Sequence, residues 1–359
     1  MIRTQDLPAE VHVLVPFDAA RRSPDFDTPE FRAELDAWFG PLGLRWHWVP
    51  VSPGEADGIA RRLRAQHVAA GLVAFNLCDG DELDGFPGLS VIEALERYGL
   101  PFTGADAAFY RISTSKLAMK TAFAHAAVRA PAHALLSHPT ADFGAEARRI
   151  ADELGFPCIV KLDIACAGYG LDRHSVASDV VGLEHALAAA GRCSLGGARG
   201  VFAERYVAAA ESTVLVCGDA SRPDEIITFP GVAMDFFPAT PANERILFHG
   251  HRDAPSPHAT DGRDSHCRYR VAPGYAQASM QALARRAYAA VAGRGYARVD
   301  MRWDERGEGY VLEVNANCAL SRDEPTIGPA LEAAGVDISR LAAMIMASAC
   351  RIAAERKAC

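Results

Sequence analysis

Apolar runs alternate with amphipathic stretches along the first hundred residues. Residues 11–17, 45–51 and 71–78 form apolar runs, whereas residues 29–39, 56–67 and 89–98 carry apolar side chains at helical spacing. The run at 71–78 is continuous, as expected of a parallel strand that is buried on both faces. Strands that alternate with helices in this way predict an open parallel sheet.

The pattern changes after the turn-forming segment 100–106, which makes a plausible domain boundary. Further helices are predicted at 115–128, 145–154, 275–291 and 338–355, and further strands at 158–162, 200–207 and 211–217. The stretch 238–273 is long, polar and rich in His, Arg, Asp and Pro. A structureless connection of that length is usually a functional loop or a lid.

A hairpin with polar side chains on one face is predicted near the carboxyl end. Val299 and Met301 alternate with Arg298 and Asp300, and residues 310–317 alternate in the same way across a Gly-containing turn. One face would then present the side chains of Arg298, Asp300, Glu313 and Asn315. Carboxylate and amide oxygens suit Mg²⁺. A solvated polar face of an antiparallel sheet is the alternative.

The composition is that of an ordinary globular protein. The 359 residues are 50% hydrophobic and 23% charged, with a net charge of −8, so nucleic acid is not an expected partner. No uncharged apolar run reaches membrane-spanning length, so no membrane partner is expected. The nine cysteines form no C-x-x-C pair, and the amino terminus lacks the apolar core of a signal peptide. We therefore expect a cytoplasmic enzyme of two or three domains.

Candidate phosphate-binding residues lie at the end of the predicted strand 158–162 and in the loop after it. Lys161 lies at its end, before a loop that contains Gly168 and Gly170. A lysine there can pair with phosphate oxygens, and glycine lets backbone N–H groups approach the same anion. Lys116 is a second candidate. An ordinary strand-to-loop turn and a surface lysine are the alternatives.

A nucleoside could bind where the strand 200–207 ends. An extended backbone at Glu204, Arg205, Tyr206 and Val207 can read the edge of an adenine, and Glu211 could accept hydrogen bonds from ribose hydroxyls. Solvated charges at a strand end are the alternative for Glu204 and Glu211.

The order and spacing of these segments resemble the ATP-grasp ligases, in particular the D-alanine–D-alanine ligase branch. Leu-Glu-Val-Asn-Ala-Asn at 312–317 is the most specific match, and the boundary segment with Lys116 is another. The resemblance implies an α/β ATP-grasp fold in which a parallel α/β domain precedes two α+β subdomains that clamp ATP. We expect an N-terminal substrate domain at 1–102, a central domain at 103–207, and a C-terminal domain at 208–359 with the lid loop 238–273.

The resemblance also implies roles for the residues. Lys116 and Lys161 would contact ATP phosphates, residues 204–207 would hold adenine, and Glu211 would hold ribose. Asp300, Glu313 and Asn315 would bind Mg²⁺ or Mn²⁺. Arg298 would stabilise the acyl phosphate and the oxyanion of the tetrahedral intermediate. A homodimer is a further expectation from the family.

The sequence departs from the family in ways that affect the substrates. Residues 14–19 lack the Gly-, Ser- and Glu-bearing turn that holds the first amino acid in D-alanine ligases. Residues 317–320 replace the usual Pro-Gly, so the backbone donor there would come from Ala319. The family's lid lysine and tyrosine have no counterpart, and His249, His251 and Arg252 are candidates to supply the positive charge, with Ser321 as a further substrate candidate. A loop that His and Arg only keep soluble is the alternative.

These observations predict an ATP-dependent ligase that joins a small-molecule carboxylate to an amine, both amino-acid-like, and that releases ADP and phosphate. The missing N-terminal glutamate makes D-alanine–D-alanine synthesis itself the less favoured alternative. A kinase-like protein or a nucleotide-binding protein without ligase activity is the other alternative.

Overall fold

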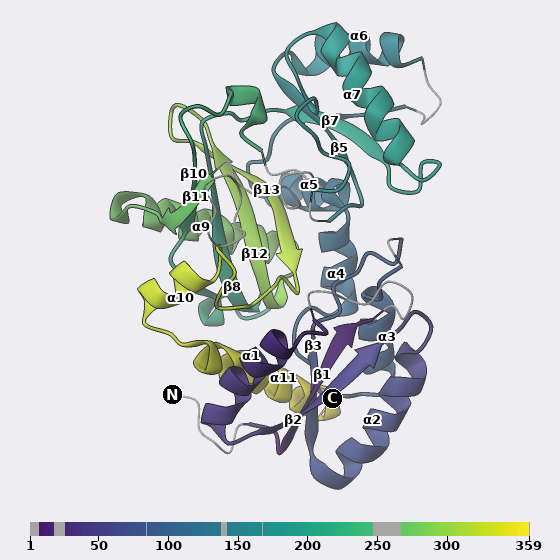
Figure 1. The fold of residues 1–359 in the computed structure, drawn as a ribbon, viewed down its shortest axis with the longest axis vertical. Helices are drawn as coiled ribbons and strands as arrows, with labels where there is room; N and C mark the ends of the chain where they lie inside the picture. The colour runs from purple at the N-terminus through teal and green to yellow at the C-terminus, as the bar shows by residue number, and fades with distance from the viewer. Residues whose placement is uncertain are drawn as a thin grey trace.

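Three β-sheets organise the chain in the computed structural model, which describes residues 7–17, 26–83, 85–137, 142–166, 168–246 and 267–358 (Figure 1). The first sheet lies at one end of the molecule, the second lies at the opposite end, and the third lies between them at one side. Both α/β and α+β arrangements are therefore present in one chain.

The N-terminal sheet is parallel, as the alternation of runs predicts. Its strand order is β2-β1-β3, with the bounds β1 Glu10–Pro16, β2 Arg45–Val51 and β3 Leu72–Asn76. Its helices are α1 Pro29–Phe39, α2 Ala56–Ala70 and α3 Leu89–Arg97, and a short 3₁₀ turn, η2, covers Gly40–Leu42. Thr28 accepts a hydrogen bond from the Phe31 amide and so begins α1. The two faces of the sheet contribute to different apolar cores, one under α1 and the other under α2 and α3.

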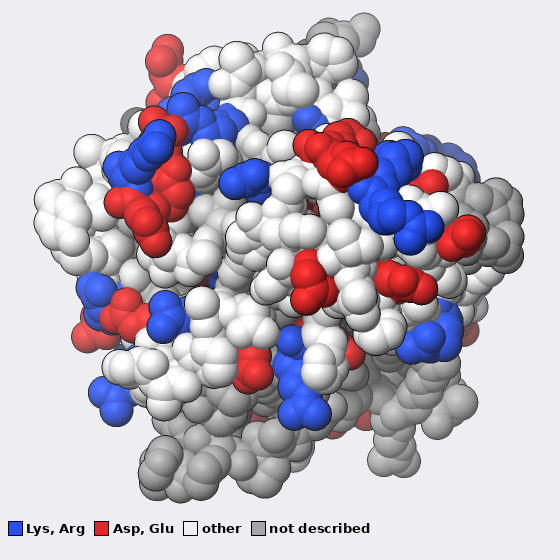
Figure 2. Space-filling view, turned by 90° about the horizontal axis from the view of Figure 1, so that it is seen from above, with Lys and Arg blue, Asp and Glu red and all other residues white. Residues whose placement is uncertain are grey.

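The second sheet in chain order, called the central sheet because it lies between the other two in sequence, is antiparallel. Its strand order is β4-β7-β5-β6. Its elements are β4 His133–Leu135, β5 Cys158–Leu162, β6 Val176–Ala177, β7 Val201–Arg205, α6 Phe143–Leu154 and α7 Val180–Cys193. Asp142 and Asp179 cap the two helices, whose apolar faces pack on the sheet. Seen from this end, acidic and basic side chains lie side by side over the surface (Figure 2).

The C-terminal sheet has the order β11-β10-β8-β12-β13, with β9 paired to β8. Its elements are β8 Ala210–Asp219, η3 Pro223–Glu225, β9 Ile227–Thr228, β10 Val232–Phe236, η4 Ala242–Glu244, β11 Cys267–Val271, α9 Gly274–Ala290, β12 Arg294–Trp303 and β13 Gly309–Ala316. Helices α4 Ala107–Thr114 and α5 Lys116–His125, although they precede the central sheet in sequence, pack on β13 and share its core through Phe109 and Phe123.

The last helices return to the N-terminal sheet. Helix α10 covers Gly328–Ala334 and α11 covers Ile338–Ala358, and α11 packs on α1 and β3. Among the described helices, no single one is long and apolar enough to cross a membrane; α10 and α11 meet the length and composition only as a pair bent by 91°.

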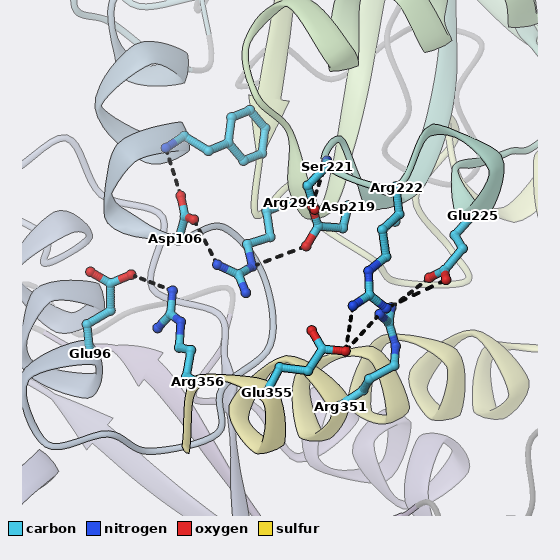
Figure 3. A network of polar contacts seen from close by, with 12 residues as sticks. Glu96, Asp106, Asp219, Ser221, Arg222, Glu225, Arg294, Arg351, Glu355 and Arg356 are labelled. Carbon is cyan, nitrogen blue, oxygen red and sulfur yellow. Dashed lines mark hydrogen bonds and ion pairs between the residues drawn. The ribbon is translucent and has the colours of Figure 1, made fainter. Parts of the chain in front are cut away.

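Charged side chains fasten α11 and α4 to the C-terminal sheet (Figure 3). Arg294, at the start of β12, donates to Asp106 at 3.1 Å and lies 3.7 Å from Asp219. Arg222 binds Glu355 of α11 at 2.5 Å, while Arg356 reaches Glu96 of α3 at 3.3 Å. The network therefore ties four segments that are distant in sequence to one another.

The expected lid loop 238–273 is partly regular structure. Its last part forms β11, which pairs antiparallel with β10 from Val232↔Val271 to Phe236↔Cys267. Residues 267–271 do alternate between apolar and charged side chains, so the prediction of a loop here missed a strand signal that the five residues carry. Residues 247–266 lie outside the described part of the chain, and His249, His251 and Arg252 lie there with them.

Candidate active site

A cleft of about 1620 Å³ opens between the central and C-terminal sheets. Most of the residues that the sequence analysis singled out line it, namely Lys116, Lys161, Gly168, Glu204, Arg205, Tyr206, Val207, Glu211, Arg298, Asp300, Glu313 and Asn315. Asp79 and Asp81, which follow β3, also line the cleft, so the segment after the N-terminal sheet contributes to its lining.

The predicted hairpin forms the acidic wall of the cleft. Strands β12 and β13 are antiparallel, with Asp300 opposite Glu313 and Arg298 opposite Asn315. Arg298 binds Asp300 with Nε at 2.9 Å and Nη2 at 3.0 Å. Thr213 on β8 donates to Asp300 Oδ1 at 2.7 Å, the oxygen that also accepts from Arg298 Nε. These contacts hold the carboxylate in place.

The side chains of this wall suit a hard divalent cation. The Asn315 amide donates to Asp300 Oδ2 at 2.7 Å and to Glu313 Oε1 at 3.3 Å, so three oxygen-bearing groups converge. Rotating that amide would present its oxygen in place of its nitrogen. Burial raises the pKa of Asp300; burial would also raise the pKa of Glu313, but the charges of Lys116, Lys161 and Arg298 lower it. Two carboxylates and an amide oxygen are ligands that Mg²⁺ accepts.

Two lysines line the cleft near this wall. Lys116 lies at the start of α5, where its Nζ is 3.4 Å from Glu313 Oε2 and donates to the Ala165 carbonyl at 2.7 Å. Lys161 is the penultimate residue of β5 and pairs with Glu204 at 2.7 Å. Gly168 has a φ of +74°, which allows the loop to turn back toward the cleft. The arrangement could bind a chain of phosphates next to a metal ion.

Glu204 is already bound by two ammonium groups. Its Oε1 contacts Lys161 at 2.7 Å and its Oε2 contacts Lys120 at 2.6 Å. Burial alone would raise the pKa of Glu204, but the two lysines outweigh it and lower the pKa to about 2. The Glu204 carboxylate thus positions Lys161, a role that was not predicted from the sequence.

Arg302 fixes the segment expected to contact the nucleoside. Its Nε donates to Glu211 at 2.8 Å and its Nη1 donates to the Val207 carbonyl at 2.8 Å, while Nη2 contacts the Arg245 carbonyl. The ring of Tyr206 lies beneath this guanidinium, and the Tyr206 hydroxyl donates to the Ala242 carbonyl at 2.8 Å. Arg205 is exposed and donates to the Leu154 carbonyl at 2.9 Å, so its side chain turns toward α6.

Some candidate residues do not line the cleft. Gly170 packs behind the loop, where an added Cβ would approach Leu162 to 2.8 Å. Ala319 is exposed beyond β13, and Ser321 accepts a hydrogen bond from the Asp323 amide at 3.1 Å within its own turn. The lid candidates His249, His251 and Arg252 fall outside the described residues.

Three residues that support the site were missed from the sequence. Lys120 lies one helical turn after Lys116, and Arg302 continues the period-two series of Arg298 and Asp300, so both carried a local signal. Thr213 carried none, because its contact with Asp300 depends on the pairing of β8 with β12.

Known proteins with related sequences and folds agree with this arrangement. A family model of the D-ala D-ala ligase C-terminus matches residues 253–347. The D-alanine–D-alanine ligase of Nitrosococcus oceani is 29% identical over 259 residues, covering 71% of this chain and 70% of that protein. The ligase of Desulforudis audaxviator is 28% identical over 315 residues, covering 86% of this chain and 88% of that protein.

Solved structures show the same fold. The D-alanine–D-alanine ligase of Bacillus anthracis complexed with ATP has a TM-score of 0.67 and 19% identity, over 97% of this chain and 99% of that one. Biotin carboxylase of Campylobacter jejuni has a TM-score of 0.65 and 13% identity, over 96% of this chain and 72% of that one. The chain has the α/β ATP-grasp fold and is similar in sequence to D-alanine–D-alanine ligases over most of its length.

Proposed function

We propose that this chain activates the carboxylate of an amino-acid-like substrate with ATP and joins it to the amine of a second substrate. The observation that carries the proposal is the convergence of Lys116 and Lys161 with Asp300 and Glu313 on one cleft. Phosphoryl transfer depends mainly on positioning and on neutralising charge, which this arrangement supplies.

The assignment of roles follows the position of each side chain. Lys116 and Lys161 bind ATP phosphates, with the loop at Gly168 providing backbone donors. The backbone of residues 204–207 holds adenine, and Glu211 holds ribose while Arg302 orients its carboxylate. Asp300, Glu313 and Asn315 hold Mg²⁺ or Mn²⁺, which would neutralise charge on the terminal phosphates.

The substrates meet at the end of the acidic wall. The substrate carboxylate attacks the terminal phosphate and gives an acyl phosphate and ADP. The amine then attacks the acyl carbon, loses a proton, and expels phosphate to leave the amide. Arg298, held by Asp300 at 2.9 Å, stabilises the acyl phosphate and the oxyanion, and the Ala319 amide is a second candidate donor.

The identity of the amino acids is the finer part of the proposal. The relatives are D-alanine–D-alanine ligases by name, so D-alanine is the first substrate to test. Residues 14–19 lack the turn that would hold its ammonium group, which favours other amino acids. A cytoplasmic location, where ATP is supplied, and a homodimer are further parts of the proposal.

A screen of paired amino acids with ATP and Mg²⁺ tests the proposal by mass spectrometry. We expect a product with the mass of both substrates less one water, together with one ADP. Glu313→Gln should lower the rate by at least about 10²-fold, because it removes a metal-binding charge without changing size. Phosphate release that needs no amine, with no amide formed, would instead establish a kinase-like activity.

A further inference from the structure

Two histidines and a glutamate lie together on the N-terminal sheet. His12 on β1 and His47 on β2 are direct partners in the parallel register, and Glu10 precedes His12 by two residues. Because side chains alternate along a strand, all three point to the same face. That face is the one that packs under α2, where Leu14 and Val49 enter the core with Leu63.

The potential ligand atoms of these side chains are close together. Glu10 Oε2 lies 3.8 Å from His12 Nε2 and 3.6 Å from His47 Nε2. The imidazole rings stack, with centroids 4.6 Å apart and planes inclined by 27°. All three ligand atoms fall within 4.8 Å of one another. In a tetrahedral zinc site the ligand atoms are about 3.4 Å apart, so only small side-chain rotations separate this geometry from a site.

His12 gives independent evidence for a ligand. The residue is 6% exposed, and its Nε2 is buried without a hydrogen-bond partner. Buried polar atoms nearly always have a partner, so this nitrogen requires an explanation.

The surrounding charges orient the glutamate. Arg45 binds Glu10 Oε1 at 2.5 Å and leaves Oε2 turned toward the imidazoles. Arg62 on α2 is the other cation close to His12. In protein metal sites, a carboxylate ligand is usually held by a hydrogen bond from a residue that does not itself bind the metal.

We propose that Glu10, His12 and His47 form a site for a divalent transition-metal ion of the Zn²⁺ type. Two imidazoles and one carboxylate are ligands that Zn²⁺ prefers, whereas Mg²⁺ prefers oxygen alone. His47 is half-exposed, so water can complete the coordination. The site is distinct from the ligase cleft, because none of its three residues lines that cleft. Glu10 pairs with Leu72 at the start of β3, whereas the cleft is reached by Asp79 and Asp81 beyond the other end of that strand.

Calorimetric titration of the metal-stripped full-length chain with ZnCl₂, in the presence of Mg²⁺, tests the site. We expect binding that His47→Ala and Glu10→Gln each weaken by at least about tenfold, since even outer partners of a metal ligand contribute that much. His185→Ala, which removes an exposed histidine from α7, and Glu313→Gln, which alters the ligase cleft, should retain the wild-type affinity.

Co²⁺ used as a second probe separates this site from the cysteines. The Co²⁺ absorption spectrum should show nitrogen and oxygen ligation without an intense thiolate charge-transfer band. His47→Ala should abolish this Co²⁺ spectrum. His47 is preferred to the buried His12 for substitution, and unchanged thermal unfolding of metal-free His47→Ala confirms its folding. Absence of Zn²⁺ binding, equal affinity in His47→Ala, or a thiolate spectrum would each overturn the proposal.

Discussion

Asp300 on β12 and Glu313 on β13 are direct antiparallel partners, and the Asn315 amide lies between their carboxylates. Two acidic groups in this position repel one another unless a cation separates them. The neighbouring cations Arg298 and Lys116 offset part of that repulsion. The relationship makes the hairpin the acidic element of the cleft between the central and C-terminal sheets.

Asp300→Asn should impair metal-dependent catalysis. The substitution keeps the size of the side chain and removes one charge, so we expect kcat to fall by about 10²–10³-fold and the Mg²⁺ requirement to rise. ADP release measured over a range of Mg²⁺ concentrations checks this. Glu305→Gln, in the exposed hairpin turn, is the matched control. A variant with wild-type kcat and Mg²⁺ dependence would contradict the metal assignment.

Glu204→Gln should destabilise the folded structure around the central sheet. The change leaves the ammonium groups of Lys120 and Lys161 buried without their carboxylate, which costs about 3–5 kcal/mol. Chemical denaturation at neutral pH measures the free energy of unfolding. The exposed Glu153 pairs with Arg149 at 3.2 Å, and Glu153→Gln should change stability by less than about 0.5 kcal/mol.

The same carboxylate predicts how stability depends on pH. The pKa of Glu204 is lowered from 4.5 to about 2 in the folded protein. The stability that ionised Glu204 contributes is therefore complete when the pH is above the unfolded-state pKa. That stability is lost as the pH falls toward the folded-state pKa. Unfolding free energies measured from about pH 5 to about pH 3 should fall more steeply for the wild type than for Glu204→Gln. Parallel curves would show that Glu204 is not the responsible group.

Arg302→Lys should weaken ATP binding more than it slows chemistry. A lysine cannot bind Glu211 and the carbonyls of Val207 and Arg245 at once, because its ammonium lacks the planar set of donors. We expect the KM for ATP to rise by about tenfold, equivalent to about 1.4 kcal/mol, with a smaller change in kcat. Steady-state kinetics with varied ATP separates the two. Arg129→Lys, at an exposed pair with Glu308, provides the comparison.

Alkylation should distinguish Cys166 from Cys318. Cys166 is exposed in the loop that lines the cleft, whereas burial raises the pKa of Cys318 to about 12. Iodoacetamide should therefore label Cys166 first, and MgATP should slow that labelling if phosphates occupy the loop. Peptide mass mapping identifies the site. Equal labelling with and without MgATP would place the nucleotide elsewhere.

Local sequence patterns determined the elements and one wall of the site. Period-two alternation placed Arg298, Asp300, Glu313 and Asn315 on one face of a hairpin, because strand geometry fixes which side chains share a face. The alternation of runs likewise gave the parallel N-terminal sheet. The hairpin and the order of strands and helices depend only on residues near one another in the chain.

Tertiary structure alone decided which charges meet. Lys120 reaches Glu204 across 84 positions because α5 and β7 border the same cleft, and nothing local specifies that contact. The pairing of Glu211 with Arg302 follows from the register of β8 against β12, and that of His12 with His47 follows from β1 against β2. A buried charge takes the partner that packing brings within reach, so the roles of these residues became apparent only once the sheets were in place.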